Sequence, residues 1–254
     1  MATTADVDSV LARFAALDEK ELEQPWHYLG KPMSVRYALY RTIEDAQEAL
    51  VAASARPHPE ARRILSLAQR AFGDLRGLLV GLSPELLDLA PRDGEWPLRE
   101  VLRHVVVIEG RYAVQTRYAA DRSDTDPMRV ANDTLPTPEQ TDVAGGVTRL
   151  LALVAATREK TDRQLADLSP AALRRPTQWV HYDVDVRFRL HRFAAHLVEH
   201  TVQCEKTLAA LGWRATEGRR IVRRLTSLLG EIEGLAAPEA VDEIERRLVE
   251  RAAT

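Results

Sequence analysis

Two histidines, His196 and His200, are separated by three residues in the run His-Leu-Val-Glu-His. The apolar pattern around them predicts a helix, in which residues four positions apart lie one above the other on one face. Two imidazoles so placed can bind one metal ion, with each nitrogen ~2.0–2.1 Å from the ion if it is zinc. The spacing also arises by chance, and an inward-facing histidine is more often a hydrogen-bonded core residue, so the pair needs support from elsewhere in the chain.

A third ligand is available in His104, which lies in a predicted helix over residues 97–121. Apolar residues flank it one turn away on either side, so its side chain should face the interior of a helical bundle. His200 falls within the apolar seam of its own predicted helix, over 185–211, and His196 lies at the edge of that seam. We therefore expect His104, His196 and His200 to form one interior metal site.

The remaining histidines are weaker candidates. His191 is rotated roughly 140–180° away from the pair on helical geometry. Three others fall in predicted turns: His27, His58 and His181.

Other catalytic motifs are missing from the sequence. The His-Glu-x-x-His motif of zinc proteases is absent, and Glu199, within the run, should be a surface charge rather than a general base. There is no glycine-rich phosphate loop, nucleotide fingerprint or convincing Ser/His/Asp order. The lone Cys204 excludes an intramolecular disulfide framework and a cysteine-rich zinc module. A small buried core residue is its commoner role, and the alternatives are a fourth ligand or a redox thiol.

Helical periodicity runs through almost the whole chain and predicts an all-α fold. Strand-like alternation occurs only over residues 180–186, and 121–137 is the longest predicted loop. The predicted helices cover residues 5–17, 34–55, 59–82, 97–121, 138–167, 185–211, 216–234 and 238–252.

Composition narrows the class of protein further. The 254 residues are 45% hydrophobic and 29% charged, which is ordinary for a soluble globular protein. The net charge of −3 gives no support for nucleic-acid binding. The first residues do not resemble a signal peptide, and the longest apolar runs are far shorter than the ~20 residues of a membrane span. We expect a cytoplasmic protein that acts on a small molecule, without nucleic-acid or membrane partners.

A weak internal repeat organises the predicted helices. Three times a helix ends in a leucine, a polar stretch and a second leucine, followed by a tryptophan and a new helix; the copies begin at Leu17, Leu82 and Leu168. The first and third copies also share Val-Arg-aromatic, at residues 35–37 and 186–188. One interpretation is three stacked helical hairpins. The other is that Leu-Ser-Pro is a common sequence where one helix ends and the next begins.

Two stretches resemble the DinB/YfiT-like metalloenzyme family. The first runs from Leu82-Ser-Pro-Glu-Leu through Gly94-Glu-Trp96 to His104 and Glu109, and the second from His196 through His200 to Gly212. The resemblance covers roughly residues 59–212. It implies a four-helix bundle in which one histidine of the second helix and the H-x-x-x-H pair of a late helix bind a metal. Here those residues are His104, His196 and His200.

The resemblance also implies a class of chemistry. The expected cofactor is a divalent ion (zinc, nickel or iron) with open positions for water or a thiolate. Relatives include S-transferases and isomerases that use low-molecular-weight thiols such as mycothiol, and 31 arginines against 4 lysines fit the high-GC genomes in which that thiol occurs. Iron-dependent sulfoxide synthases of the family carry an acidic residue two positions after the histidine pair, whereas Val202 stands here. No catalytic side chain beyond the metal ligands is identified.

The chain extends beyond the resemblance on both sides. We predict an N-terminal helical extension over 1–57, a four-helix bundle over 58–212 and a C-terminal helical extension over 213–254. When the first and third copies of the repeat are aligned, Asp45 corresponds to His196. The extensions could line the cleft or form the interface of a homodimer. The alternative function is a non-catalytic metal-binding helical module that mediates dimerisation or partner binding.

Some remaining side chains have two interpretations each. Trp96, Trp179 and Tyr182 could roof a pocket above the metal or pack on the bundle end. Arg189 lies two turns before His196 on nearly the same face, where a guanidinium could clamp a carboxylate. The tail arginines could bind an anion or pair with neighbouring glutamates; they are Arg214, Arg219, Arg220, Arg223 and Arg224.

Overall fold

The computed structural model describes residues 4–253 and confirms the all-α class. Three short 3₁₀ turns, at Pro84–Leu87, Asn132–Thr134 and Pro138–Gln140, join the α-helices. The helices are α1 (Thr4–Ala16), α2 (Glu19–Leu22), α3 (Val35–Ser54), α4 (Glu60–Leu79), α5 (Leu98–Asp121), α6 (Val147–Leu165), α7 (Pro170–Leu173), α8 (Val186–Ala210), α9 (Glu217–Gly234) and α10 (Pro238–Ala252). None of these helices has the length and apolarity needed to cross a membrane.

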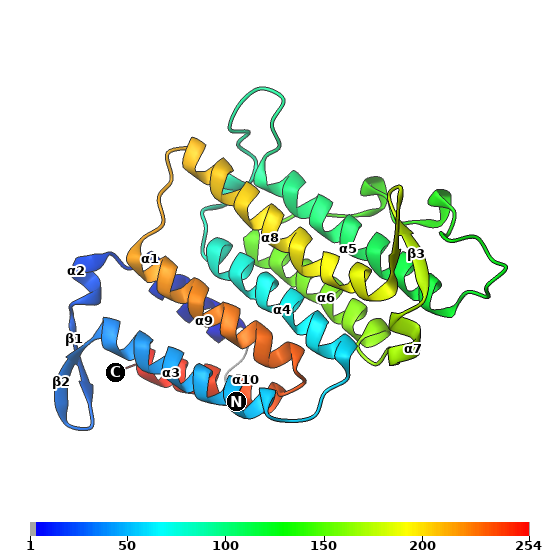
Figure 1. Cartoon of the computed structure of the whole chain (residues 1–254). Coiled ribbons are helices and arrows are strands. Elements are labelled where there is room, and N and C mark those ends of the chain that lie inside the picture. Colours follow the sequence, from blue (N-terminus) through cyan, green and yellow to red (C-terminus); the bar gives the residue numbers. More distant parts are fainter. Residues whose placement is uncertain (1–3, 254) are drawn as a thin grey trace.

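Helices α4, α5, α6 and α8 form a four-helix bundle around one hydrophobic core (Figure 1). Each contributes an apolar stripe at helical spacing, as Val101 and Val105 do on α5 and Phe193 and Leu197 on α8. All four of these side chains are fully or almost fully buried. This bundle is the scaffold that holds the histidines.

The other long helices, α1, α3, α9 and α10, share a second hydrophobic cluster. The N-terminal and C-terminal extensions therefore pack on each other rather than forming separate appendages. The second group meets the bundle mainly where α9 runs alongside α4 (Figure 1).

Glycines bring α4 and α9 into unusually close contact. A Cβ at Gly73 would lie 2.1 Å from the carbonyl oxygen of Thr226, and one at Gly230 would lie 2.3 Å from the carbonyl oxygen of Gln69. Only glycine leaves room for two helix backbones at that separation. Since Gly77 meets Arg223, earlier on α9 than Thr226, the two helices are antiparallel.

Two β-hairpins of four-residue strands interrupt the helices. Strands β1 (Pro25–Tyr28) and β2 (Lys31–Ser34) pair antiparallel before α3, and β3 (Pro176–Trp179) and β4 (Tyr182–Asp185) pair in the same register before α8. Strand-like alternation in the sequence is present only near the second hairpin, so the first hairpin was not predicted. Its strands pair only with each other and are too short for a clear alternation.

The hairpins show that the repeat is twofold rather than threefold. The short helix, the hairpin and the start of the next long helix occur twice, and corresponding residue numbers are offset by a constant 151, as for Pro25 and Pro176. The middle copy has only the 3₁₀ turn at Pro84–Leu87 and no hairpin, so the structure does not support the interpretation as three equivalent hairpins. Ion pairs repeat as well: Arg187 bonds Glu60 at the start of α4, and Arg36 bonds Glu217 at the start of α9.

One helix boundary differs substantially from expectation. Helix α6 begins at Val147, whereas a start near residue 138 was predicted. Gly145 has φ +94°, which a right-handed helix does not allow, and Gly146 caps the helix. Residues 122–146 therefore form a long connection with two 3₁₀ turns. It covers part of the bundle near the β3–β4 hairpin.

Candidate metal centre

The structure brings His104, His196 and His200 together at the contact between α5 and α8. The Nε2 atom of His196 lies 3.3 Å from Nε2 of His104 and 2.9 Å from Nε2 of His200. One ring nitrogen from each residue lies within 4.8 Å of the others. Among the residues described, no cysteine or carboxylate joins this group.

The three histidines are poorly placed to carry positive charge. His196 and His200 are 4% and 7% exposed, and His104 is half-buried. Burial, reinforced by the neighbouring histidines, lowers the pKa of His196 to about 3. Burial, together with His200, also lowers the pKa of His104. Both imidazoles are therefore neutral at physiological pH, which is the form that binds a metal.

Gln203 fixes the orientation of His200. The Nδ1–H of His200 donates to the Gln203 side-chain oxygen over 2.7 Å, which leaves the Nε2 lone pair directed at the other two rings. Metal-binding histidines usually have such a partner on the far nitrogen. The sequence analysis gave Gln203 no role, although its position three residues after His200 places it on the same helix face.

The donor set fits a divalent ion. In a tetrahedral site with bonds of ~2.0–2.1 Å, two ligand nitrogens are separated by about 3.3 Å. The measured separations of 3.3 and 2.9 Å around His196 are close to that value. Between two neutral imidazole nitrogens in contact, only one can carry a proton and donate it to the other. Where three such nitrogens converge, lone pairs are therefore left without a hydrogen bond, and a cation would bind them.

Aromatic rings flank the histidines on two sides. The ring of Trp96 lies 5.3 Å from that of His104, and the ring of Tyr112 lies 5.4 Å from that of His196. Trp96 and Gln203 also line an open cavity of about 720 Å³. On the other side, Tyr112 and Trp179 line a smaller cavity of about 220 Å³. Trp96 and Trp179 therefore each line a cavity beside the histidines, which agrees with one of the two interpretations of these residues.

The other residues singled out from the sequence lie away from the centre. Tyr182, the first residue of β4, is 59% exposed, and its ring lies 4.1 Å from that of His181. His191 is exposed on α8, and the His58 Nε2 lies 2.8 Å from the backbone oxygen of Ala53. His27 lies in strand β1 rather than in the turn that was expected.

Cys204 is a buried core residue and Glu199 is a surface charge. Cys204 is fully buried, burial raises the pKa of its thiol to about 12, and it does not join the histidine group, so it is a core residue. Glu199 is exposed, and its carboxylate lies 3.9 Å from Arg192. It lines the larger cavity near Gln203 without contacting the ring nitrogens.

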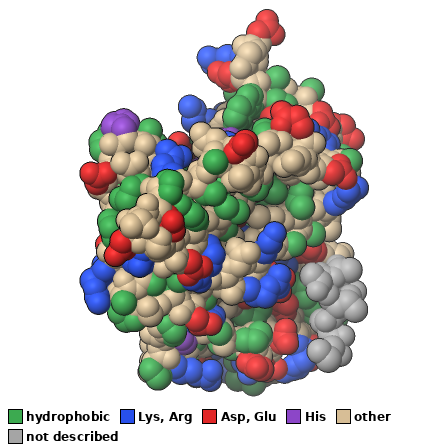
Figure 2. All heavy atoms as spheres, turned by 90° about the vertical axis from the view of Figure 1, so that its right-hand side faces the viewer, with side chains coloured by type: hydrophobic (Ala, Val, Ile, Leu, Met, Phe, Trp, Pro, Cys, Tyr) green, Lys and Arg blue, Asp and Glu red, His purple; other side chains and the backbone are tan. Residues whose placement is uncertain are grey.

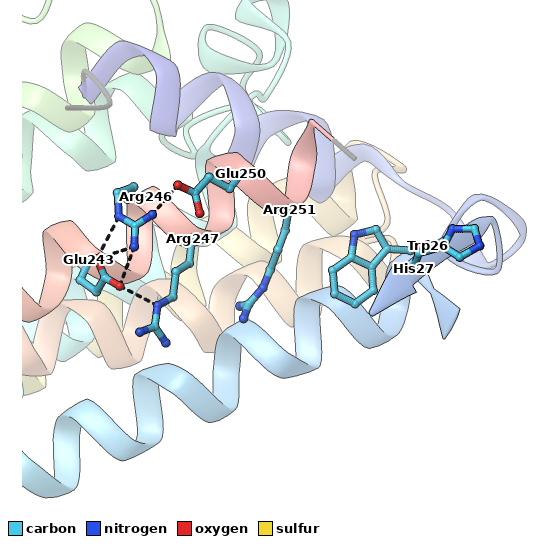
Figure 3. Close-up of a pocket in the computed structure, with 7 residues that line it drawn as sticks. All are labelled: Trp26, His27, Glu243, Arg246, Arg247, Glu250 and Arg251. Carbon is cyan, nitrogen blue, oxygen red and sulfur yellow. Dashed lines mark hydrogen bonds and ion pairs between the residues drawn. The ribbon is translucent and has the colours of Figure 1, made fainter. Parts of the chain in front are cut away.

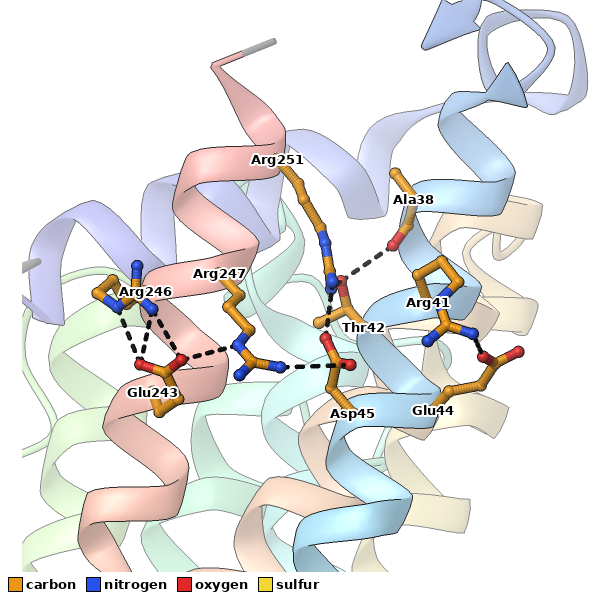
Figure 4. A network of polar contacts seen from close by, with 9 residues as sticks. All are labelled: Ala38, Arg41, Thr42, Glu44, Asp45, Glu243, Arg246, Arg247 and Arg251. Carbon is orange, nitrogen blue, oxygen red and sulfur yellow. Dashed lines mark hydrogen bonds and ion pairs between the residues drawn. The ribbon is translucent and has the colours of Figure 1, made fainter. Parts of the chain in front are cut away.

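The second helical group contains an ion-pair cluster where the repeat would place a metal site. Asp45, the counterpart of His196, lies 2.7 Å from Arg251 and 3.5 Å from Arg247 on α10 (Figure 4). Ala49 stands in the place of His200. The nearby cavity of about 390 Å³ is lined by arginines and glutamates of α10 together with Trp26 (Figure 3). This half has no histidine cluster in the part of the chain described here.

The tail arginines do not form a common anion-binding patch. Arg219 is buried and donates to the backbone oxygens of Leu78 and Val80 at the end of α4. Arg223 pairs with Asp74 and Glu205. These side chains connect α9 to the bundle. Figure 2 faces the opposite end of the molecule, which carries the β3–β4 hairpin, and shows basic and acidic side chains interspersed there.

The comparisons with known proteins agree with this geometry. The model of the DinB superfamily matches residues 67–204, more than half of the chain. The chain belongs to the DinB superfamily. All three clustered histidines lie inside the DinB match, as does Gln203.

One solved structure similar to this DinB chain is YfiT from Bacillus subtilis. It is described as a probable metal-dependent hydrolase with an unusual four-helix bundle topology. The identity is 16% and the TM-score 0.48, over 63% of this chain and 93% of that one. No curated protein matches the chain.

Proposed function

We propose that the chain is a metal-dependent enzyme acting on a small molecule, with His104, His196 and His200 holding one divalent ion (zinc, nickel or iron). The observation that carries the proposal is the convergence of three ring nitrogens without a fourth protein ligand among the described residues. A divalent ion at this position would act as a Lewis acid that lowers the pKa of a bound thiol or water.

The same observation favours an enzyme over a non-catalytic module. Structural zinc sites are closed by four protein ligands, whereas catalytic sites keep a position open for substrate or water. Here the nearest thiol, Cys204, is buried in the core and outside the cluster. The half-buried His104 contacts Trp96, which is 46% exposed and lines the larger cavity. These features support access from solvent to the histidines.

Side chains around the histidines have separate tasks in this proposal. Gln203 holds His200 in the tautomer whose Nε2 can bind the ion. The rings of Trp96 and Tyr112 shield the histidines on two sides. Burial raises the pKa of the Tyr112 hydroxyl, so the phenol stays protonated at neutral pH and can donate a hydrogen bond to a substrate.

For the reaction, we propose an S-transfer or isomerisation that uses a low-molecular-weight thiol of the mycothiol type as co-substrate. The chain itself supplies no thiolate for such a reaction, because its one cysteine, Cys204, is buried and burial raises the pKa of the thiol to about 12. The thiol must then enter with the substrate. A small-molecule substrate, a cytoplasmic location and a homodimeric assembly complete the proposal.

A thermal-shift screen tests both levels of the proposal. Zinc, nickel and iron(II) are each combined with mycothiol, bacillithiol or glutathione, using wild-type protein, His196→Ala and the control His191→Ala. We expect a metal-induced rise in Tm in wild type and control that His196→Ala abolishes, and a further rise with a thiol only when metal is present. A thiol-induced rise without metal would contradict thiol activation at this site, and no metal-induced rise would contradict the site itself.

A further inference from the structure

The smaller cavity, of about 220 Å³, has an unusual concentration of arginine. It lies between α5, α8, the 122–146 connection and the β3–β4 hairpin, and three guanidinium groups line it: Arg111, Arg129 and Arg189. Its other walls are mainly apolar or aromatic, including Ile108 and Trp179. We refer to it as the arginine cavity.

Arg189 is buried, and no carboxylate of the described residues pairs with it. It is 3% exposed, and it donates from Nε to the Thr116 hydroxyl over 3.3 Å and from Nη1 to the backbone oxygen of Gln178 over 2.8 Å. Burial, with the positive charge of Arg129, lowers the pKa of Arg189 to about 10, so it remains charged at neutral pH. A buried charge without a counterion is costly, and an anion bound in the cavity would offset that cost.

The two other guanidinium groups also lack a carboxylate partner among the described residues. The Nε of Arg111 is buried and has no hydrogen-bond partner, and Arg129 makes one long hydrogen bond, of 3.4 Å, to the backbone oxygen of Val180. Arg187, which is half-buried like Arg111 and Arg129, by contrast pairs with Glu60. Three cations face one small space with no acid to neutralise them.

The hairpin and the connection hold the cavity in a defined shape. The side-chain amide of Gln115 bonds both the N–H and the carbonyl oxygen of Val130, which fixes the connection beside Arg129. Val180, a β-branched residue, is held at φ 55° at the rim. That conformation is rare for valine and costs energy, so the turn is kept by its surroundings.

The arginine cavity lies next to the histidines. Tyr112 lines it and also contacts the ring of His196. Arg189 precedes His196 by seven residues on α8, which corresponds to about 10 Å along the helix axis. The arginine cavity therefore borders the histidine cluster, and the ring of Tyr112 lies between the two.

We propose that the arginine cavity binds the carboxylate end of the substrate, with the apolar body of the molecule packed against the rings of Tyr112 and Trp179, which contact each other. The assignment of the ligand as a substrate rests on the function proposed above, whereas the binding of a carboxylate does not. The planar guanidinium fork matches a carboxylate in a bidentate way, and the small apolar cavity suits a compact acid.

The test is isothermal titration calorimetry on metal-free protein, so that no carboxylate can bind through an ion. The probes are 3-phenylpropanoate, its neutral amide 3-phenylpropanamide, and phenyl phosphate. The variants are Arg111→Gln and Arg129→Gln, which alter half-buried side chains that make few or no hydrogen bonds, with Arg149→Gln as control. Arg149 is 60% exposed and pairs with Asp142 on the surface. Circular dichroism confirms that each variant is folded.

We expect 3-phenylpropanoate to bind at least about tenfold more tightly than the amide, and each cavity variant to weaken its binding about tenfold. The control should bind like wild type. Equal binding of acid and amide, or acid binding unaffected by both cavity variants, would overturn the proposal. Tighter binding of phenyl phosphate would overturn the assignment to a carboxylate. Because no metal is present, these outcomes are independent of whether the histidines bind an ion.

Discussion

Replacing Gly73 by alanine should weaken the contact between the bundle and the second helical group. The new Cβ would lie 2.1 Å from the Thr226 carbonyl oxygen and 2.7 Å from its carbonyl carbon. These are backbone atoms of α9 and cannot rotate away. Reaching ordinary contact would require the two helices to separate locally by about 1.3 Å.

The expected loss of stability follows from two opposing effects. Overpacking a tight interior costs about 1–3 kcal/mol, and a clash between two backbones belongs at the upper end of that range. Alanine is intrinsically about 1 kcal/mol better than glycine inside a helix. We therefore expect Gly73→Ala to lower the free energy of unfolding by about 2 kcal/mol, which corresponds to a decrease in Tm of about 4–8 °C.

Gly230, on the α9 side of the same contact, provides a second test of this prediction. Gly230→Ala should cost a similar amount, since its Cβ would lie 2.3 Å from the Gln69 carbonyl oxygen. One separation of α4 and α9 would accommodate both new methyl groups, so the double variant should lose less than the sum of the single losses. The control is Gly110→Ala on α5, whose nearest neighbour would be the Pro136 ring at 3.3 Å.

Urea unfolding followed by far-UV circular dichroism measures these differences. We expect Gly110→Ala to stay within about 1 kcal/mol of wild type, because the gain in helix propensity offsets a minor shift of the proline. If Gly73→Ala proves as stable as Gly110→Ala, or if the two interface variants are fully additive, the interpretation of the glycines as spacers between α4 and α9 is refuted.

Three further predictions concern the bundle and the site. Arg158→Leu should lower the free energy of unfolding in urea by about 3–5 kcal/mol, because it leaves the carboxylate of Glu109, 2% exposed, without its buried cation. Adding Glu109→Leu to the same chain should restore much of that loss, and no restoration would contradict the pairing. The thiol of Cys204, with a pKa of about 12, stays protonated from pH 7 to 10, so native protein should resist iodoacetamide across that range. Urea-unfolded protein should react faster as the pH rises through ~8.5. Rapid labelling of native protein would show instead that the thiol is accessible. Gln203→Leu removes the acceptor of the His200 Nδ1–H and should weaken metal binding about 10–100-fold in competition with a chelating dye, whereas unchanged affinity would exclude an orienting role.

The helices of the bundle and the three histidines could be predicted from the sequence because both depend on local periodicity. The apolar stripes of α5 and α8 determine which faces are buried, and the histidines lie on or beside those stripes. The resemblance to the DinB family then related His104, on one helix, to a pair 92 residues later. Periodicity alone does not reveal which two helices are neighbours.

Features that depend on tertiary contacts were not predictable in the same way. The first hairpin, β1–β2, has no alternation long enough to detect, and the late start of α6 is decided by the backbone at Gly145. The close approach of α4 and α9 is encoded in glycines spaced four apart on each helix, but a glycine pattern has meaning only once its partner is known. The same holds for the arginine cavity, whose three arginines come from three separate segments.

Metal stoichiometry tests the central claim most directly. Protein purified without chelators or metal-affinity resin is loaded with zinc, desalted and analysed by inductively coupled plasma mass spectrometry. The variants are His196→Ala with His200→Ala and the control His191→Ala, which alters an exposed histidine of the same helix. The account predicts one divalent ion per chain in wild type and control, and none in the double variant. Stoichiometric metal that survives the loss of both histidines would contradict it, as would wild-type protein that retains no metal.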